Sequence, residues 1–325
     1  FTGPSAVAVL SASAIASLLG MGFYFLQARI YLFKVPLKTI PLSPIYRFGL
    51  IVWLTGLATF ALANHIDRIL IWYLLKDRAQ IGYYSIATVL LVSLHGLLTS
   101  GWGITILPAL SEAQAKYGSR GIAQALNGYC KLLVFIVLPW LMFLGRYADI
   151  VVLSLFGRVY SASVHLLRTY IIFDIVAIFF MAGIMGFSLY VIDKEKLLLK
   201  LCILSGVLNI ILDFLLIPLY GALGAIIATG ISVAVYSLLE LLFVFKYIPI
   251  RYPYRFIGKV FFAGIICLFF LSWIKTQNLW SLFAIGMLYV ILLAIAFYFL
   301  KILEPQDKEF LIKLNPSFAS VLRYF

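Results

Sequence analysis

Charged residues are scarce in this chain, and their scarcity excludes a water-soluble fold. Asp, Glu, Lys and Arg together make up 11% of the 325 residues, whereas hydrophobic residues make up 64%. Soluble domains are about 25% charged and about 45–50% apolar. The composition therefore predicts a protein whose main solvent is the lipid bilayer.

Cysteine is also scarce, and the sequence contains no recognisable catalytic motif. The three cysteines, Cys130, Cys202 and Cys267, are too few and too scattered for a disulfide framework or a metal site. We find no glycine-rich phosphate loop and no convincing nucleophile–base pair. We therefore expect no catalytic residue, no cofactor and no metal. Basic stretches interleaved with aromatic residues are also missing outside the apolar segments, so we expect no nucleic-acid partner.

Long apolar segments occupy most of the chain. A bilayer core about 30 Å thick needs roughly 20 apolar residues per helix. The sequence predicts an all-α polytopic membrane protein with about nine transmembrane helices. The expected spans are 5–28, 48–74, 82–108, 128–155, 162–191, 195–218, 222–248, 256–274 and 279–302.

The connectors alternate between basic and non-basic, which predicts the orientation of the chain. Of the 25 Lys and Arg residues, 18 fall on one side of the expected spans and 6 on the other. Cytoplasmic loops carry the Lys and Arg excess, so we expect a cytoplasmic C-terminus in a multi-pass protein of the inner (plasma) membrane. The same excess explains the net charge of +13 through contact with anionic membrane lipid. An odd number of spans places the N-terminus outside, and the chain begins Phe1-Thr2-Gly3-Pro4. We expect this chain to be part of a longer protein.

Two groups of motifs resemble the C-terminal half of the multidrug/oligosaccharidyl-lipid/polysaccharide exporter superfamily, especially its polysaccharide-transporter (O-antigen flippase-like) branch. The first group comprises Asn64 to Leu70, Ile81 to Ala87 and Leu107 to Ser111. The second runs from Leu208 through Ile217-Pro218 to Gly221-Ala222-Leu223-Gly224-Ala225 and Ala228-Thr229. Apart from the resemblance, Pro218 is expected to end a helix, and Gly221 and Gly224 to allow a tight turn before a helix with a small-residue packing face.

The resemblance implies a two-bundle transporter of which this chain holds one six-helix bundle plus flanking helices. Residues 1–47 would be the last helix of the first bundle and a cytoplasmic linker. Residues 48–250 would be the second six-helix bundle, and residues 251–325 two extra membrane helices with a cytoplasmic tail. Counted in this way, the chain holds spans six to fourteen of a fourteen-span member.

The function implied by the resemblance is that of a flippase. It would move polyprenyl-diphosphate-linked oligosaccharides from the cytoplasmic to the outer leaflet for surface polysaccharide synthesis, by alternating access. Its partners would be the lipid-linked oligosaccharide, membrane lipid and polysaccharide assembly proteins. Two alternatives remain: a drug/cation antiporter of the same superfamily, and a membrane glycosyltransferase or polymerase that uses the same lipid-linked sugars. The external connectors are short for such an enzyme, so we expect the protein not to be one.

Polar groups inside the expected spans are the candidate site residues, because charged side chains at this depth are costly and usually face a cavity or a partner. An Arg can hold a phosphate through its fork of donors, and a buried carboxylate can bind a coupling proton or cation. The expected substrate-binding residues are Asn64, Asp67, Arg68, Arg168 and Asn209, and the expected ion-coupling residues are Asp174 and Asp213. For each of them a structural role is the alternative: Asp67 and Arg68 as a self-neutralising pair, Arg168 reaching the surface, and Asn209 in interhelical hydrogen bonding. His95 and Glu240 are expected to be structural.

Overall fold

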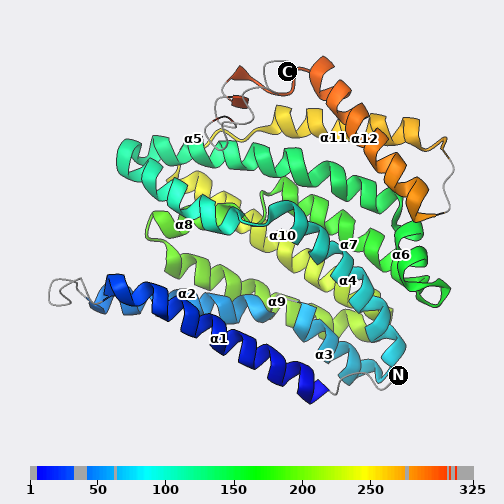
Figure 1. The fold of residues 1–325 in the computed structure, drawn as a ribbon, viewed down its shortest axis with the longest axis horizontal. Coiled ribbons are helices and arrows are strands. Elements are labelled where there is room, and N and C mark those ends of the chain that lie inside the picture. Colours follow the sequence, from blue (N-terminus) through cyan, green and yellow to red (C-terminus); the bar gives the residue numbers. More distant parts are fainter. Residues whose placement is uncertain are drawn as a thin grey trace. The chain divides into compact units, whose positions relative to one another are not determined.

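The computed structural model describes residues 6–32, 42–61, 64–274 and 278–305, together with 307, 308 and 312. Within these residues the ordered elements are helices, and none of them is a strand. Figure 1 shows their order along the chain. The helices are α1 (Ala6–Leu32), α2 (Leu42–Ala61), α3 (Asn64–Leu75), α4 (Arg78–Thr99), α5 (Trp102–Arg146), α6 (Ala148–Phe156), η2 (Arg158–Tyr160), α7 (Ala162–Phe179), α8 (Met185–Val191), α9 (Glu195–Tyr220), α10 (Ala222–Tyr247), α11 (Tyr254–Leu271) and α12 (Leu279–Phe299).

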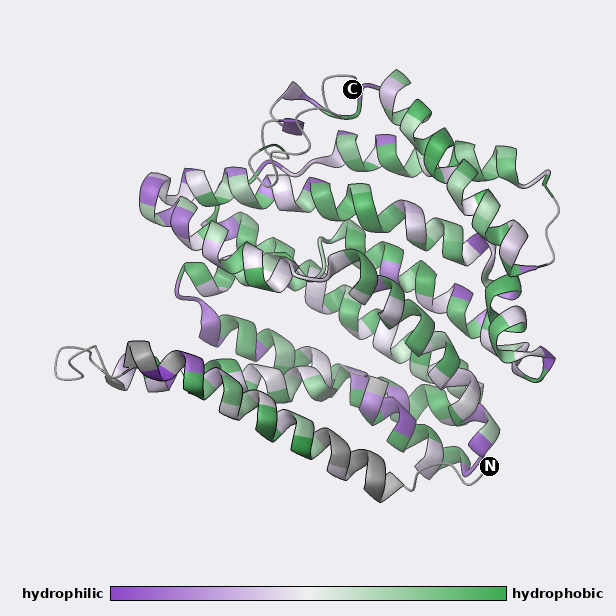
Figure 2. Ribbon diagram, in the orientation of Figure 1, coloured by the Kyte–Doolittle hydropathy of each residue, from purple (hydrophilic) through white to green (hydrophobic). Residues whose placement is uncertain are grey.

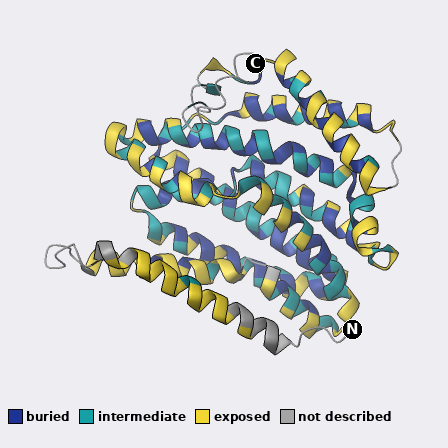
Figure 3. Cartoon of the chain, in the orientation of Figure 1, coloured by how far each residue is buried: buried dark blue, intermediate teal, exposed yellow. Residues whose placement is uncertain are grey.

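Eight helical segments of the described chain are long and apolar enough to cross a bilayer, and a shorter apolar segment, Ala14–Gln27, lies within α1. Hydrophobic residues dominate these helices, whereas hydrophilic residues gather at helix ends and connectors (Figure 2). Large hydrophobic side chains such as Phe270 and Trp280 are exposed on the outward faces (Figure 3). Apolar faces of this kind are stable in lipid, where the helix satisfies its own backbone groups. The prediction of an all-α polytopic membrane protein is confirmed.

Three of the expected spans have different boundaries in the structure. The span expected at 82–108 ends at Thr99, because Gly101 adopts a left-handed conformation with φ 85°. The span expected at 128–155 is the second part of α5, and it bends at Tyr147 into α6. The span expected at 162–191 is divided into α7 and α8 by a turn that contains Met181 at φ 60° and Gly183 at φ 79°. Apolar residues continue on both sides of the turn at Met181 and Gly183, so hydropathy alone does not reveal this third break.

Within α5, Gly118 interrupts the helical conformation with φ 60° and ψ −150°. The interruption separates an exposed segment, in which Lys116 pairs with Glu112 at 2.5 Å, from the apolar segment that follows. Gly121 is helical, and its missing side chain lets the two segments of α5 approach closely.

Two compact units make up the chain, Phe1–Gly49 and Leu50–Phe325, and each is described by itself. The second unit is built around α10, which packs against α9 and α7, while α4 packs against α7 and α5 against α11. Gly230 of α10 contacts the ring of Phe173 on α7 so closely that a side chain there would overlap it. Gly224, Ala225 and Ala228 are buried, as the small-residue packing face predicted.

A tight turn at Gly221 joins α9 and α10 into an antiparallel hairpin. Gly221 has φ 61°, a conformation that favours glycine, and its N–H bonds to the carbonyl of Ile217 at 2.8 Å. The turn is where we predicted it, but Pro218 lies inside the last turn of α9 and the helix ends at Tyr220. The side chain of Gln80 on α4 accepts a hydrogen bond from the N–H of Ala222 at 3.1 Å. The start of α4 is therefore tied to the α9–α10 turn.

Candidate functional site

Five polar side chains from four helices converge inside the second unit, and we call them the carboxyl cluster: Asp67 on α3, Tyr84 on α4, Asn209 and Asp213 on α9, and Thr229 on α10. Thr229 donates a hydrogen bond to Asp67 Oδ2 at 2.5 Å, and the Tyr84 hydroxyl donates to the same oxygen. The Asn209 amide donates to Asp67 Oδ1 at 3.2 Å and to Asp213 Oδ2 at 3.3 Å. One amide group thus bridges two carboxyl groups.

Local sequence explains how the helices bring these groups together. Asn209 and Asp213 are four residues apart, which places them on the same face of α9. Asp67 lies in the first described turn of α3. Asp213 lies seven residues before the end of α9 at Tyr220, and Thr229 lies seven residues after the start of α10 at Ala222. At 1.5 Å per residue, both lie about 10 Å below that end of the helices.

The carboxyl cluster is buried, and no cationic side chain of the described residues pairs with it. Asp67, Asn209 and Asp213 have 0% exposure. Among the described residues, no Lys, Arg or His lies within ion-pairing distance of Asp67 or Asp213, and Asp213 Oδ1 has no hydrogen-bond partner. Two carboxylates in one buried site repel each other unless a proton or a cation lies between them. Carboxylate, amide and hydroxyl oxygens are the donors that hard cations prefer, so the cluster can hold either.

Arg68 turns away from Asp67, although the two residues are neighbours in sequence. Its guanidinium donates to Thr88 Oγ1 of α4 at 3.4 Å, and its buried Nε has no partner among the described residues. The two side chains thus do not form the self-neutralising pair that was the structural alternative. A half-buried guanidinium without a carboxylate partner retains donors for an anionic ligand.

Two other expected site residues lie in separate contacts. Asp174 of α7 pairs with His95 Nε2 of α4 at 2.5 Å, and both side chains are partly exposed. Arg168 donates from Nε to the carbonyl of Gly145 at 3.1 Å and lies 3.3 Å from Asp149 Oδ1. Arg168 therefore ties α7 to the end of α5 and the start of α6. Neither residue reaches the carboxyl cluster.

The structure thus brings together Asp67, Asn209 and Asp213 of the expected site residues, and it leaves Arg68, Arg168 and Asp174 in other contacts. The side chain of Asn64 lies outside the described residues. Sequence reasoning missed Tyr84 and Thr229 as members of the cluster. Both stand inside the motifs that carried the family resemblance, Ile81 to Ala87 and Leu208 to Thr229, so the motifs held a signal for them.

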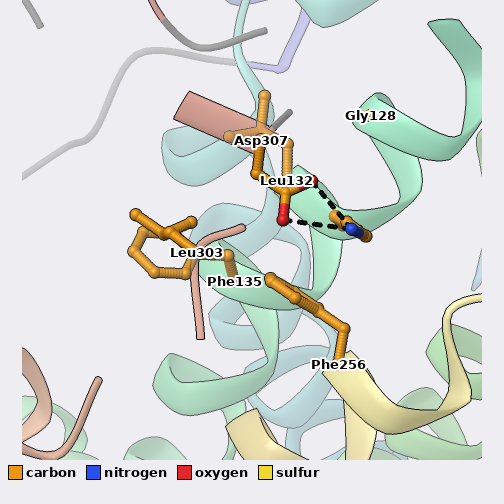
Figure 4. A pocket seen from close by; sticks show the side chains of 7 residues that line it. Gly128, Leu132, Phe135, Phe256, Leu303 and Asp307 are labelled. Atoms are coloured by element: carbon orange, nitrogen blue, oxygen red, sulfur yellow. Dashed lines mark hydrogen bonds and ion pairs between the residues drawn. The ribbon is translucent and has the colours of Figure 1, made fainter. Parts of the chain in front are cut away.

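A further buried charge lies at the opposite end of the bundle, where Lys131 of α5 contacts the segment after α12. Lys131 Nζ lies 2.8 Å and 3.0 Å from the two oxygens of Asp307, and 5.5 Å from the centre of the Phe256 ring (Figure 4). The side chains of Lys131 and Asp307 are only 14% and 11% exposed. The adjoining pocket, with a volume of about 20 Å³, has room for about one water molecule. It is therefore a structural contact rather than a substrate site.

Known proteins share both the sequence and the fold of this chain. It is 25% identical over 163 residues to "Probable low-salt glycan biosynthesis flippase Agl15" of Haloferax volcanii, and this match covers 47% of the chain and 32% of the relative. Its structure is similar to that of the lipid II flippase MurJ in an inward closed conformation, with a TM-score of 0.61 and 20% identity over 80% of this chain and 54% of MurJ. The chain thus spans about a third of the length of Agl15 and about half that of MurJ.

The sequence pattern of a whole family covers slightly more than half of the chain. The family described as "Polysaccharide biosynthesis protein" matches residues 1–165 of 325. The match includes α3 and α4, which supply Asp67 and Tyr84 to the carboxyl cluster. The chain therefore belongs to the polysaccharide biosynthesis protein family, as its resemblance to the polysaccharide-transporter branch predicted.

Proposed function

We propose that this protein is a lipid-linked oligosaccharide flippase. It moves polyprenyl-diphosphate-linked sugars from the cytoplasmic to the outer leaflet of the plasma membrane for surface polysaccharide synthesis. Family membership supports this substrate class, and both Agl15 and MurJ carry the word flippase in their names. The observation that carries the proposal is the carboxyl cluster, a buried polar site inside a bundle of membrane-spanning helices, for which the described part of the chain supplies no cationic partner.

The transported head group sets the chemical demand on the protein. A sugar diphosphate must cross hydrocarbon without losing its polar contacts, while its lipid tail stays in the bilayer. We assign the diphosphate to Arg68, whose Nε is buried without a partner within the described residues. Asn64, Asp67, Arg168 and Asn209 remain proposed substrate contacts. Arg168 is the weakest of them, because Gly145 and Asp149 already engage its guanidinium.

The driving force for transport would enter at buried carboxyl groups. We assign coupling-ion binding to Asp213 together with Asp67, because their shared site needs a proton or a cation for neutrality. Asp174, paired with His95, is the second proposed coupling residue. Residues 48–250 would form the moving six-helix bundle. Residues 1–47 would connect it to the first bundle, and residues 251–325 would add two helices and a cytoplasmic tail.

A leaflet-resolved assay tests the proposal directly. The protein is reconstituted into vesicles that contain a fluorescent polyprenyl-diphosphate oligosaccharide, and the label in the outer leaflet is then quenched chemically. We expect the quenched fraction to rise with time only in vesicles that contain the protein. An unchanged fraction, together with uptake of cationic drugs, would instead indicate an antiporter. Elongation of the labelled glycan would indicate a polymerase.

Arg68 gives a specific prediction in this assay. Arg68→Lys should retain part of the transport, because it keeps the positive charge, whereas Arg68→Ala should abolish transport by removing both the charge and the fork of donors. The matched control is Arg78→Ala, at an exposed position at the start of α4. Transport by Arg68→Ala at the rate of Arg78→Ala, with equal protein levels, would return Arg68 to a structural role.

The proposed orientation makes a second prediction. Lys196 and Tyr220 lie at opposite ends of α9, which at 1.5 Å per residue is about 39 Å long. Cysteines introduced at these two positions should react with a membrane-impermeant thiol reagent from opposite sides: position 196 from the cytoplasm and position 220 from outside. Cys130, Cys202 and Cys267 are buried and should contribute little background. Labelling of both introduced cysteines from one side would refute the orientation.

A further inference from the structure

Glu240, in the inner half of α10, is a third buried carboxyl group, after Asp67 and Asp213, and the proposed transport site does not use it. It is 2% exposed. The Tyr236 hydroxyl hydrogen-bonds to its carboxyl group, and the Cys202 thiol of α9 donates to Tyr236 at 3.4 Å. Glu240 Oε2 has no partner within the part of the chain that the structure describes. Lys246, the basic residue in the last turn of α10, does not pair with Glu240; its amine lies over the ring of Tyr247.

Among the residues that the structure describes, the surroundings of Glu240 contain titratable groups but no positive charge paired with its carboxyl group. Tyr190 on α8, Cys202 on α9 and Tyr236 on α10 face it. No ion pair of Glu240 with Lys, Arg or His occurs within the described chain. Gly186 of α8 brings its backbone so close that a Cβ there would lie 2.7 Å from Glu240 Oε1. The carboxyl group is thus enclosed by three helices, and an ionised form would be an unbalanced charge in the membrane interior.

Glu240 and the carboxyl cluster lie at the two ends of one polar line. Thr229 and Glu240 are eleven residues apart on α10, which is about three turns and about 16 Å, and they share a face. Cys202 and Asp213 are also eleven residues apart, and they share a face of α9. Because α9 and α10 pack antiparallel around the Gly221 turn, the two faces meet. Glu240 lies seven residues from the inner end of α10, as Thr229 does from its outer end.

Buried polar groups continue between these two ends. We call the whole line the α9–α10 seam; its members are Cys202, Ser205, Asn209 and Asp213 on α9 and Thr229, Ser232, Tyr236 and Glu240 on α10. All but Tyr236 are buried, and Tyr236 is partly buried. Ser205 Oγ, Ser232 Oγ, Asp213 Oδ1 and Glu240 Oε2 each have no hydrogen-bond partner among the described residues. Buried polar atoms of this kind are normally satisfied by ordered water.

We propose that Glu240 is an inner proton-binding site, and that water held along the α9–α10 seam connects it to the carboxyl cluster. Glu240 would take up a proton from the cytoplasmic side or release one to it. Along the seam, each water molecule accepts a proton from one neighbour and gives a different proton to the next. One O–H bond forms for each that breaks. The role of this proton site in transport rests on the proposed ion-coupled flippase function. The protonation of Glu240 itself can be measured without transport.

Infrared difference spectroscopy of the reconstituted protein, between acidic and alkaline buffer, provides the test. A protonated buried carboxyl group gives a carbonyl stretching band that shifts in heavy water. We expect Glu240→Gln to remove one such band, while Glu112→Gln, at an exposed position on α5, should leave it unchanged. Gly186→Ala should shift the band rather than remove it, because the new methyl group displaces the flexible end of Glu240. A band unchanged in both Glu240→Gln and Gly186→Ala would overturn the proposal.

The seam has a separate test, which distinguishes it from the flippase proposal. Protein-dependent acidification of vesicles loaded with a pH-sensitive dye is measured with an imposed proton gradient and without lipid-linked sugar. Ser205→Val together with Ser232→Val should slow it by about tenfold, the effect of losing a hydrogen-bond partner at a buried site. The Glu240 infrared band should remain. Wild-type acidification in the double variant would refute the water path, whatever the result of the flipping assay.

Discussion

Asparagine at Asp67 or at Asp213 should uncouple transport from its ion gradient. Asp67 accepts hydrogen bonds from Tyr84, Thr229 and Asn209, and a neutral amide cannot replace a carboxylate as their common acceptor. Hydrogen bonds to a charged group contribute about 1.5–3 kcal/mol each, so ion affinity should fall by at least about tenfold. Transport with an imposed proton or sodium gradient should then equal the rate without one. The leaflet assay, run with each gradient in turn, measures this effect and identifies the ion.

Two control variants make this result specific. Asp193→Asn changes an exposed residue at φ 57°, a conformation that asparagine tolerates, and it should keep wild-type coupling. Asp174→Asn examines the other proposed coupling residue, which is paired with His95. If Asp174→Asn alone removes gradient dependence, the coupling group is the Asp174–His95 pair. Wild-type dependence in both Asp67→Asn and Asp213→Asn would assign the carboxyl cluster a purely structural role.

Alanine at Gly224 should open the α9–α10 hairpin and destabilise the protein. A Cβ at this position would overlap the carbonyl group of Leu216 and lie 2.8 Å from the Ile217 nitrogen. These are backbone atoms of the preceding helix, so they cannot turn aside as a side chain could. Overpacking of this kind costs about 1–3 kcal/mol. Thermal unfolding of the purified protein in detergent should show a clear drop in midpoint.

The matched control is Gly258→Ala on α11, because a Cβ at Gly258 would have no neighbour within 4 Å. Alanine is favoured over glycine in a helix interior by about 0.5–1 kcal/mol, so this variant should be equal to or slightly more stable than the wild type. Gly224→Ala should also weaken gradient dependence, since Thr229 lies five residues further along the displaced helix. A midpoint for Gly224→Ala as high as that for Gly258→Ala would contradict the packing described here.

Hydropathy predicted most of the fold because a helix that crosses lipid must consist mainly of apolar residues. It did not predict the turn at Met181 and Gly183, since the residues on both sides of that turn are as apolar as those in a continuous helix. The cost of a charge in lipid identified Asp67, Asp174 and Asp213 as candidates. Their partners could not be read in the same way, because His95 and Asp174 are 79 positions apart and Thr229 and Asp67 are 162 apart.

Local spacing also could not settle the relation between Asp67 and Arg68. Adjacent positions on a helix do not face each other, but the long Arg68 side chain could still turn towards Asp67, so the position of the neighbouring helices decides whether the two pair. Tyr84 and Thr229 hold Asp67 on one side, whereas Thr88 takes the guanidinium of Arg68 on the other. The assignment of roles to these residues remains a prediction, and the Arg68 and Asp67 variants test it separately.

The contact between Lys131 and Asp307 also affects how the protein is made. Asp307 follows Lys131 by 176 positions, so this partner of the nearly buried cation is synthesised long after the cation itself. At about 5–20 residues per second, that interval is roughly 10–35 s. During this time the amine of Lys131 has to stay hydrated at the membrane surface, where a positive charge also resists translocation. The same lysine would thus first fix the direction in which α5 inserts and only later close the finished bundle.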